Sequence, residues 1–150
     1  MAENIIMCGY LGICSCYDCK SRRIPLWLLY VGILLGTVYA GLMFLAGRLT
    51  WQAILTGLVP GGIMLLYSHL TEGKLGGGDG LMVIFAGLFW QWESCTAAVL
   101  VACFLTFWAA LLLILSGKGH RNTQLPFAPF LLAGIVIVWI IQSFSGDVCA

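Results

Sequence analysis

Four long uncharged stretches constrain this chain more than any other feature of its sequence. Residues 26–46, 49–70, 94–116 and 125–145 each run for about 20 positions without Asp, Glu, Lys or Arg. A helix of about 20 apolar residues crosses the roughly 30 Å hydrocarbon core of a bilayer. The whole chain is 61% hydrophobic and only 9% charged, whereas soluble domains carry about 25% charged residues. The sequence therefore predicts an all-α membrane protein and excludes a soluble globular domain.

Two further uncharged stretches, residues 4–17 and 80–92, hold 14 and 13 residues. Helices of these lengths reach only about 20 Å, so they predict short or partial spans. With both included, we expect a polytopic bundle of about six transmembrane helices, two of them short, with both termini outside. This topology places most basic residues on the cytosolic side, in agreement with the positive-inside rule. These are Lys20, Arg22, Arg23, Lys74, Lys118 and Arg121, and Arg48 is the exception.

Nothing in the sequence divides the chain into separate units. It contains no linker, internal repeat or low-complexity tract, so residues 1–150 are expected to form a single membrane-embedded domain. The first apolar stretch lacks the basic region and cleavage site of a signal peptide and is interpreted as a membrane helix. A net charge of +1 gives no sign of a nucleic-acid partner. The lipid bilayer is the partner that the composition indicates.

The cysteines Cys14, Cys16 and Cys19 form a cluster that raises the question of zinc or redox chemistry. A structural zinc ion usually needs four ligands, often from two paired motifs, and the sequence has no second pair. Cysteine in a membrane helix behaves mostly as a small hydrophobic residue. We therefore expect neither a metal ion nor another cofactor.

Asp18 and Asp79 are the candidate catalytic residues. Each lies beside the predicted cytosolic end of an apolar segment, and two long apolar segments separate them. Two crossings return the chain to the side it left, so both carboxylates are expected on one face of the bilayer. Two carboxylates in a partly dry site can share one proton and activate water, as in an aspartic protease. A lone acid at an interface is more often a solvated helix end, so it is the pair that favours catalysis.

A glycine-rich segment surrounds Asp79. Gly76, Gly77 and Gly78 precede it and Gly80 follows it. Glycine permits positive φ and the close approach of other backbone, so these residues are expected to form a flexible catalytic or substrate-binding loop. No phosphate-binding fingerprint is present. We expect the loop to deliver Asp79 to the start of a helix, whose partial positive charge favours a carboxylate.

Two prolines are further candidates for the substrate-binding region. Pro25 suits the first turn of the helix that follows the basic loop near Asp18, because its missing N–H costs nothing there. Pro60 falls in the middle of a span, beside two glycines, where it is expected to kink or loosen the helix. Ordinary helix packing through small residues is an equally weighted alternative for Pro60.

The order of these motifs resembles that of the type IV prepilin peptidases, a family of membrane aspartic proteases with a Gly-x-Gly-Asp motif. The resemblance covers nearly the whole chain and rests on three places. They are Asp18 followed by Ile24-Pro25, Pro60-Gly61 leading to Gly76-Gly77-Gly78-Asp79, and Leu125-Pro126-Phe127-Ala128-Pro129-Phe130 at the start of the last span.

The resemblance implies that Asp18 and Asp79 form a catalytic dyad that removes the short leader peptide from prepilin or pseudopilin precursors. The implied location is the bacterial cytoplasmic membrane, with the active site of the multi-pass chain facing the cytosol. The chain has no room for the Cys-x-x-Cys domain of larger members, so it is similar to the short peptidases of tight-adherence pilus systems. No N-methyltransferase activity is expected. Leu81 departs from the family pattern, because many members carry Lys there.

Two other functions fit parts of the pattern. Tyr17-Asp18 and the glycine-rich motif also resemble presenilin-like intramembrane proteases, but six spans are too few and the Pro-Ala-Leu element of that group is missing. A small membrane transporter or assembly subunit without enzyme activity would use the two Asp residues for protons or cations. Leader cleavage that depends on both Asp residues favours the peptidase, and ion flux that depends on them favours the transporter.

Overall fold

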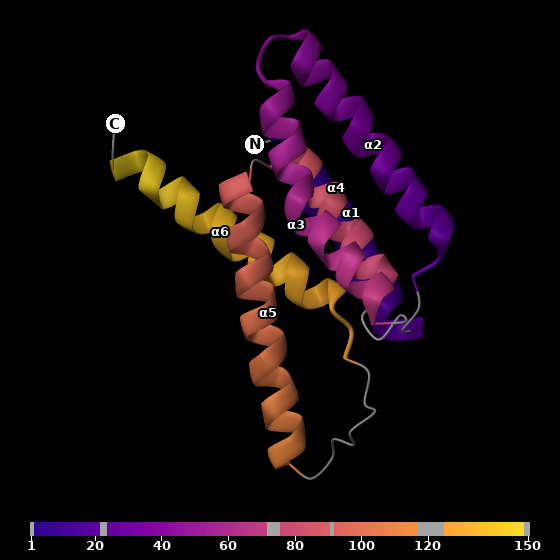
Figure 1. The fold of residues 1–150 in the computed structure, drawn as a ribbon. Coiled ribbons are helices and arrows are strands. Elements are labelled where there is room, and N and C mark those ends of the chain that lie inside the picture. The colour runs from indigo at the N-terminus through magenta and orange to yellow at the C-terminus, as the bar shows by residue number, and fades with distance from the viewer. Residues whose placement is uncertain (1, 22–23, 72–75, 91, 117–124, 149–150) are drawn as a thin grey trace.

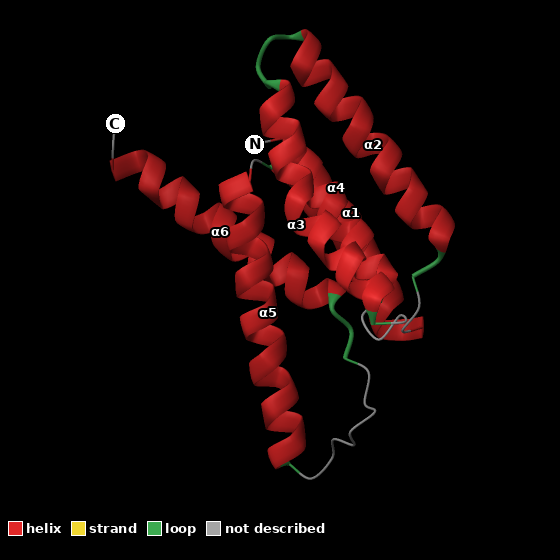
Figure 2. Ribbon diagram, in the orientation of Figure 1, coloured by secondary structure: helices red, strands yellow, loops and turns green. Residues whose placement is uncertain are grey.

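The computed structural model is built from α-helices, and no β-strand occurs in the part of the chain that it describes (Figure 2). It describes residues 2–21, 24–71, 76–90, 92–116 and 125–148. The predicted all-α membrane bundle is confirmed. The helices are α1 (Ala2–Ser21), α2 (Leu26–Leu45), α3 (Trp51–Leu70), α4 (Gly77–Phe89), α5 (Trp92–Leu115) and α6 (Ala128–Val148) (Figure 1).

The helix lengths follow the apolar pattern of the sequence, with one difference in α1. Helices α2, α3 and α5 are long and apolar enough to cross a membrane, and α4 is a shorter apolar helix. α4 has 13 residues, in agreement with the short span predicted from the uncharged stretch 80–92. α1 has 20 residues, because the helix continues past its apolar stretch to Ser21. Asp18 therefore lies inside a helix rather than after it.

α4 is the central helix of the bundle. It contacts α1, α2, α3 and α5, and most of its residues from Gly80 to Leu88 are buried. A helix that is apolar on all sides is stable only when other helices or lipid surround it. The helices around it, α2, α3 and α5, instead expose many large apolar side chains. This distribution is typical of helices whose outer faces contact lipid.

Glycines allow α3 and α4 to pack with their backbones close together. A Cβ atom at Gly57 would overlap a backbone carbonyl of α4, and one at Gly61 would lie 2.6 Å from the backbone nitrogen of Ile84. On the other helix, a Cβ at Gly80 would lie 2.7 Å from Cδ2 of Leu65. Residues with higher numbers in α3 contact residues with lower numbers in α4, so the two helices are antiparallel. These contacts fix the position of α4 against α3.

Pro60 is buried within α3, which runs without interruption from Trp51 to Leu70. Its neighbour Gly61 provides one of the close contacts with α4, whereas a Cβ at Gly62 would meet no atom within 4 Å. These contacts favour the helix-packing explanation of the proline-glycine segment.

α1 runs antiparallel to α4. Near the start of α1, Asn4 accepts a hydrogen bond of 3.0 Å from Nε1 of Trp90, the residue that follows α4. The end of α1 therefore lies toward the start of α4. This arrangement places Asp18, in the last turn of α1, and Asp79, in the first turn of α4, at the same end of the bundle.

Candidate active site

Among the acidic residues whose side chains the structure describes, Asp18 alone is buried, with 8% of its surface exposed. Its Oδ2 atom accepts a hydrogen bond of 3.1 Å from the backbone N–H of Ala128, at the start of α6. Ala128 is 0% exposed, so this bond is shielded from water. A buried charge needs such a partner, since an isolated carboxylate is strongly destabilised away from water.

The start of α6 explains why this N–H is available. The N–H of Phe130 donates to the carbonyl of Phe127 at 3.0 Å, which makes Phe127 the residue before the first turn. Pro129 has no N–H, and the N–H of Ala128 has no acceptor within its own helix. Asp18 supplies that acceptor. α6 begins three residues later than the apolar stretch predicts.

Asp79 lies in the first turn of α4, whose N-cap is Gly76. The N–H of Asp79 donates to the carbonyl of Gly76 at 3.0 Å. The Oδ2 atom of Asp79 lies 3.1 Å from the position that a Cβ of Gly76 would occupy. A larger residue would therefore crowd the carboxylate, and glycine leaves that space open.

The start of α4 lies close to two other helices. A Cβ at Gly78 would lie 3.5 Å from Cδ1 of Leu29 in α2, and one at Gly77 would lie 3.8 Å from Oγ of Ser68 in α3. Gly80 packs against α3 more tightly still. Gly80 therefore serves helix packing, whereas a Cβ at Gly77 or Gly78 would make only ordinary contacts.

The prediction that these glycines form a flexible loop is wrong for residues 76–80. Gly77, Gly78 and Gly80 are part of α4, and Gly76 is its N-cap with a φ of −61°. Among the described residues, positive φ occurs at Gly47, far from this segment. The absence of a Cβ permits close helix packing as well as unusual φ, and at Gly80 the packing applies. Residues 72–75, which precede the segment, lie outside the described residues.

The two carboxylates interact electrostatically. Burial, and after it the negative charge of Asp18, together raise the pKa of Asp79 from 3.8 to about 6. The helix start at Asp79 favours the ionised form, but burial and the second carboxylate outweigh it. A carboxyl group with a pKa near 6 can both give and take a proton close to neutral pH.

The two candidate prolines lie at different distances from the carboxylates. Pro25 is the N-cap of α2, with a φ of −65°, so it precedes the first turn in which it was predicted. It lies one turn before Leu29, which approaches Gly78. Pro60 lies about 12 Å along α3 from Ser68, the α3 residue beside the start of α4. The structure brings Pro25 toward the site and leaves Pro60 farther along α3.

Two groups near the carboxylates could not be identified from the sequence. One is the N–H of Ala128, although Pro126 and Pro129 around it do indicate a helix start. The other is Ser68, a buried polar residue, 7% exposed, within an apolar helix. Leu81 is partly buried and packs against the hydrophobic core.

The cysteine cluster does not converge on one point. Cys14 is buried in α1, whereas Cys16 and Cys19 are exposed. Within the described ranges, no three His, Cys, Asp or Glu side chains are placed to hold a metal ion.

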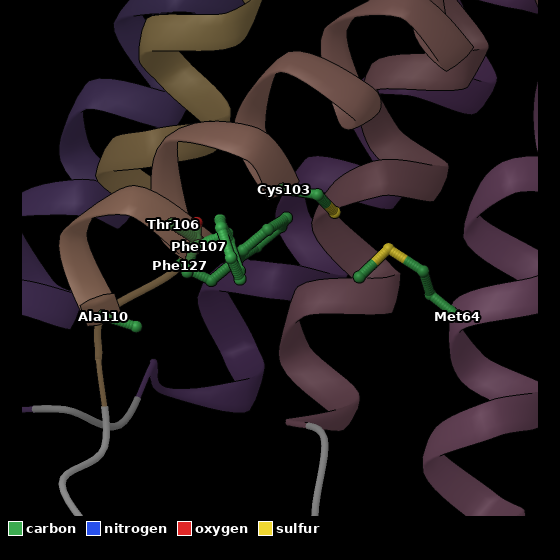
Figure 3. A pocket seen from close by; sticks show the side chains of 6 residues that line it. All are labelled: Met64, Cys103, Thr106, Phe107, Ala110 and Phe127. Atoms are coloured by element: carbon green, nitrogen blue, oxygen red, sulfur yellow. The ribbon is translucent and has the colours of Figure 1, made fainter. Parts of the chain in front are cut away.

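An apolar pocket of about 260 Å³ lies between α3 and α5 (Figure 3). It is lined by Met64, Cys103, Thr106, Phe107, Ala110 and Phe127. The hydroxyl group of Thr106 donates to the carbonyl of Ala102 at 2.7 Å. None of these lining residues is acidic or basic, so the pocket offers no group that could take part in acid–base catalysis. Phe127 is the lining residue next to Ala128, which contacts Asp18.

Comparison with known proteins identifies the family of this chain. The model of the type IV leader peptidase family matches residues 5–111, a range that includes Asp18 and Asp79 and ends before α6. No curated protein matches the chain significantly, and no solved structure does. Since the family match covers more than half of the sequence, the chain belongs to the type IV leader peptidase family.

Proposed function

We propose that this chain is an aspartic endopeptidase of the membrane in which Asp18 and Asp79 form the catalytic dyad. The observation that carries the proposal is the pair itself. One carboxylate is buried at the end of α1, and the other, at the start of α4, has a pKa raised to about 6 by burial and by its partner. Membership of the leader peptidase family supplies the reaction, which is the removal of a leader peptide.

Two carboxylates that hold one proton between them can hydrolyse a peptide bond. The ionised group accepts a proton from water as the water attacks the carbonyl carbon, and the protonated group donates to the carbonyl oxygen. A difference between the two environments favours this division of roles, because one group must be charged while the other is neutral.

Prepilin and pseudopilin precursors are the proposed substrates. Their apolar helix can lie in the bilayer beside the bundle while the basic leader stays at the headgroups, so the bond to be cut lies at the membrane surface. Lys20, in the last turn of α1, is two positions from Asp18. Because basic residues accumulate on the cytosolic side, we place the site at the cytosolic face of the bacterial cytoplasmic membrane.

Co-expression with candidate precursors tests the proposal. Mass spectrometry should show that the wild-type chain shortens the precursor by its leader, and that Asp18→Asn and Asp79→Asn leave it at full length. Glu93→Gln is the matched control, since Glu93 is an exposed acid in the first turn of α5. It should process the precursor like the wild type. Full processing by either Asp variant, at equal protein levels, would rule out the dyad.

The same variants distinguish a transporter from a peptidase. In vesicles that contain the purified chain, a transporter would show proton or cation flux that is lost in Asp18→Asn and Asp79→Asn. Flux that depends on these residues, together with unchanged precursor processing, would assign the two acids to transport instead of hydrolysis.

A further inference from the structure

We infer that the N–H at the start of α6 holds Asp18 as the ionised member of the pair, which makes Asp18 the general base and Asp79 the general acid. The inference rests on the proposed function and assigns a separate role to each carboxylate. It is carried by the hydrogen bond of 3.1 Å from the N–H of Ala128 to Oδ2 of Asp18, between residues that are 0% and 8% exposed.

Both the hydrogen bond and the orientation of α6 favour a charged Asp18. A backbone N–H can only donate, and it bonds more strongly to a carboxylate than to a neutral carboxyl group. The start of a helix also carries a partial positive charge, which α6 directs at Asp18. Asp18 itself belongs to the last turn of α1, where the partial charge is negative and disfavours ionisation. The contact with α6 therefore opposes the effect of its own helix.

The surroundings of Asp79 favour the protonated state. Burial, followed by the negative charge of Asp18, raises the pKa of Asp79 to about 6. Asp79 is the only titratable residue of α4. α6 has none before Asp147, near its opposite end. Cys14, one turn before Asp18 on α1, is a further titratable group that interacts with Asp18. The charge difference within the pair therefore depends on the contact that α6 makes.

The assignment gives a balanced reaction. The oxygen of water bonds to the carbonyl carbon while its proton moves to Asp18 and the proton of Asp79 moves to the carbonyl oxygen, which forms a gem-diol. The proton on Asp18 then moves to the amide nitrogen, the C–N bond breaks and the amine leaves. A hydroxyl proton of the gem-diol returns to Asp79, so the pair regains its starting state. The only co-reactant consumed is water.

Ala128→Pro removes this N–H while keeping a residue that helices favour at their first position. Ala128→Val is the matched control, because it adds a similar volume at this buried position and retains the N–H. With purified protein in detergent and a prepilin substrate, kcat should fall about 10- to 100-fold in Ala128→Pro relative to Ala128→Val, with KM nearly unchanged. The acid limb of the pH profile of kcat should also differ between the two variants, because only Ala128→Val keeps the N–H that contacts the carboxylate pair. Equal kcat values and equal acid limbs in the two variants would overturn the assignment.

Infrared spectroscopy provides a test that does not depend on the folding of the proline variant. At about pH 6, near the pKa of Asp79, the wild type should show the band of a protonated carboxyl group, and Asp79→Asn should remove it. A band that persists in Asp79→Asn and disappears in Asp18→Asn would reverse the roles.

The failure of this inference is distinguishable from the failure of the proposed function. If both Asp→Asn variants still cleave the precursor, the peptidase dyad is lost. If they are inactive while Ala128→Pro behaves like Ala128→Val, only the role of α6 is lost.

Discussion

Gly61→Ala tests whether the position of Asp79 depends on the close packing of α3 and α4. The new Cβ would lie 2.6 Å from the backbone nitrogen of Ile84 and 3.0 Å from its Cα, whereas ordinary contact begins at 3.4 Å. Relieving the contact requires the helices to separate locally by about 0.8 Å, and overpacking of this kind costs about 1–3 kcal/mol. The free energy of unfolding in detergent should fall by that amount.

Gly62→Ala is the matched control on the next residue of the same helix. A Cβ there meets no atom within 4 Å, and alanine is favoured over glycine inside a helix by about 0.5–1 kcal/mol. This variant should be as stable as the wild type or slightly more stable. The contrast between the two variants isolates the packing contact from the general effect of replacing glycine.

Gly61→Ala should also slow leader cleavage. Ile84 and Asp79 belong to the same helix, so a shift at Ile84 moves Asp79 relative to Asp18. A displacement of about 1 Å at a catalytic group can reduce the rate about 100-fold. Cleavage should therefore fall in Gly61→Ala and persist in Gly62→Ala when both are assayed below their unfolding midpoints. If Gly61→Ala matches Gly62→Ala in stability and in cleavage, the close packing of α3 on α4 does not control the site.

Three further predictions concern stability in detergent. Asp79 binds its proton more tightly in the folded protein than in the unfolded chain, because its pKa is about 6 instead of 3.8. The free energy of unfolding should therefore fall by about 1–3 kcal/mol as the pH rises from 4 to 7. This decrease should be smaller in Asp79→Asn, and equal decreases in the two proteins would contradict the burial of Asp79. Tyr10→Phe removes the 2.8 Å hydrogen bond from the hydroxyl group to the carbonyl of Leu28 and should destabilise the fold by about 1 kcal/mol. An unchanged free energy of unfolding in chemical denaturant would show that this bond contributes nothing to stability. Asn4→Ala removes the hydrogen-bond acceptor of Trp90, at the end of the bundle away from the carboxylates. It should lower stability by about 1 kcal/mol while the cleavage rate stays within about twofold of the wild type. A larger loss of cleavage would indicate coupling between the two ends of the bundle.

The long helices were predictable because the thickness of the bilayer fixes how many apolar residues a span needs. The stretches 26–46 and 49–70 correspond to α2 and α3 within a few residues. The end of α1 was not predictable by the same criterion. Tyr17, Cys19 and Lys20 are exposed, while Asp18 between them is buried. A polar last turn with one buried face cannot be distinguished from a loop by apolarity alone.

The candidate site was predictable only in part. Counting crossings places Asp18 and Asp79 on one face because an even number of spans separates them, and the structure places them at one end of the bundle. The contact between Asp18 and Ala128 joins residues 110 positions apart, and no local pattern encodes such a tertiary contact. The sequence does not distinguish a loop glycine from a packing glycine such as Gly80, because flexibility and close packing require the same missing side chain.

Leader cleavage by the purified chain tests most directly whether Asp18 and Asp79 together hydrolyse the precursor. In a single-turnover reaction in detergent, the wild type should convert a prepilin into the mature chain and the free leader, both identified by mass. The Asp18→Asn, Asp79→Asn double variant, with folding verified by its unfolding midpoint, should release no leader. Release of the leader by the folded double variant at the wild-type rate would contradict the role of the dyad.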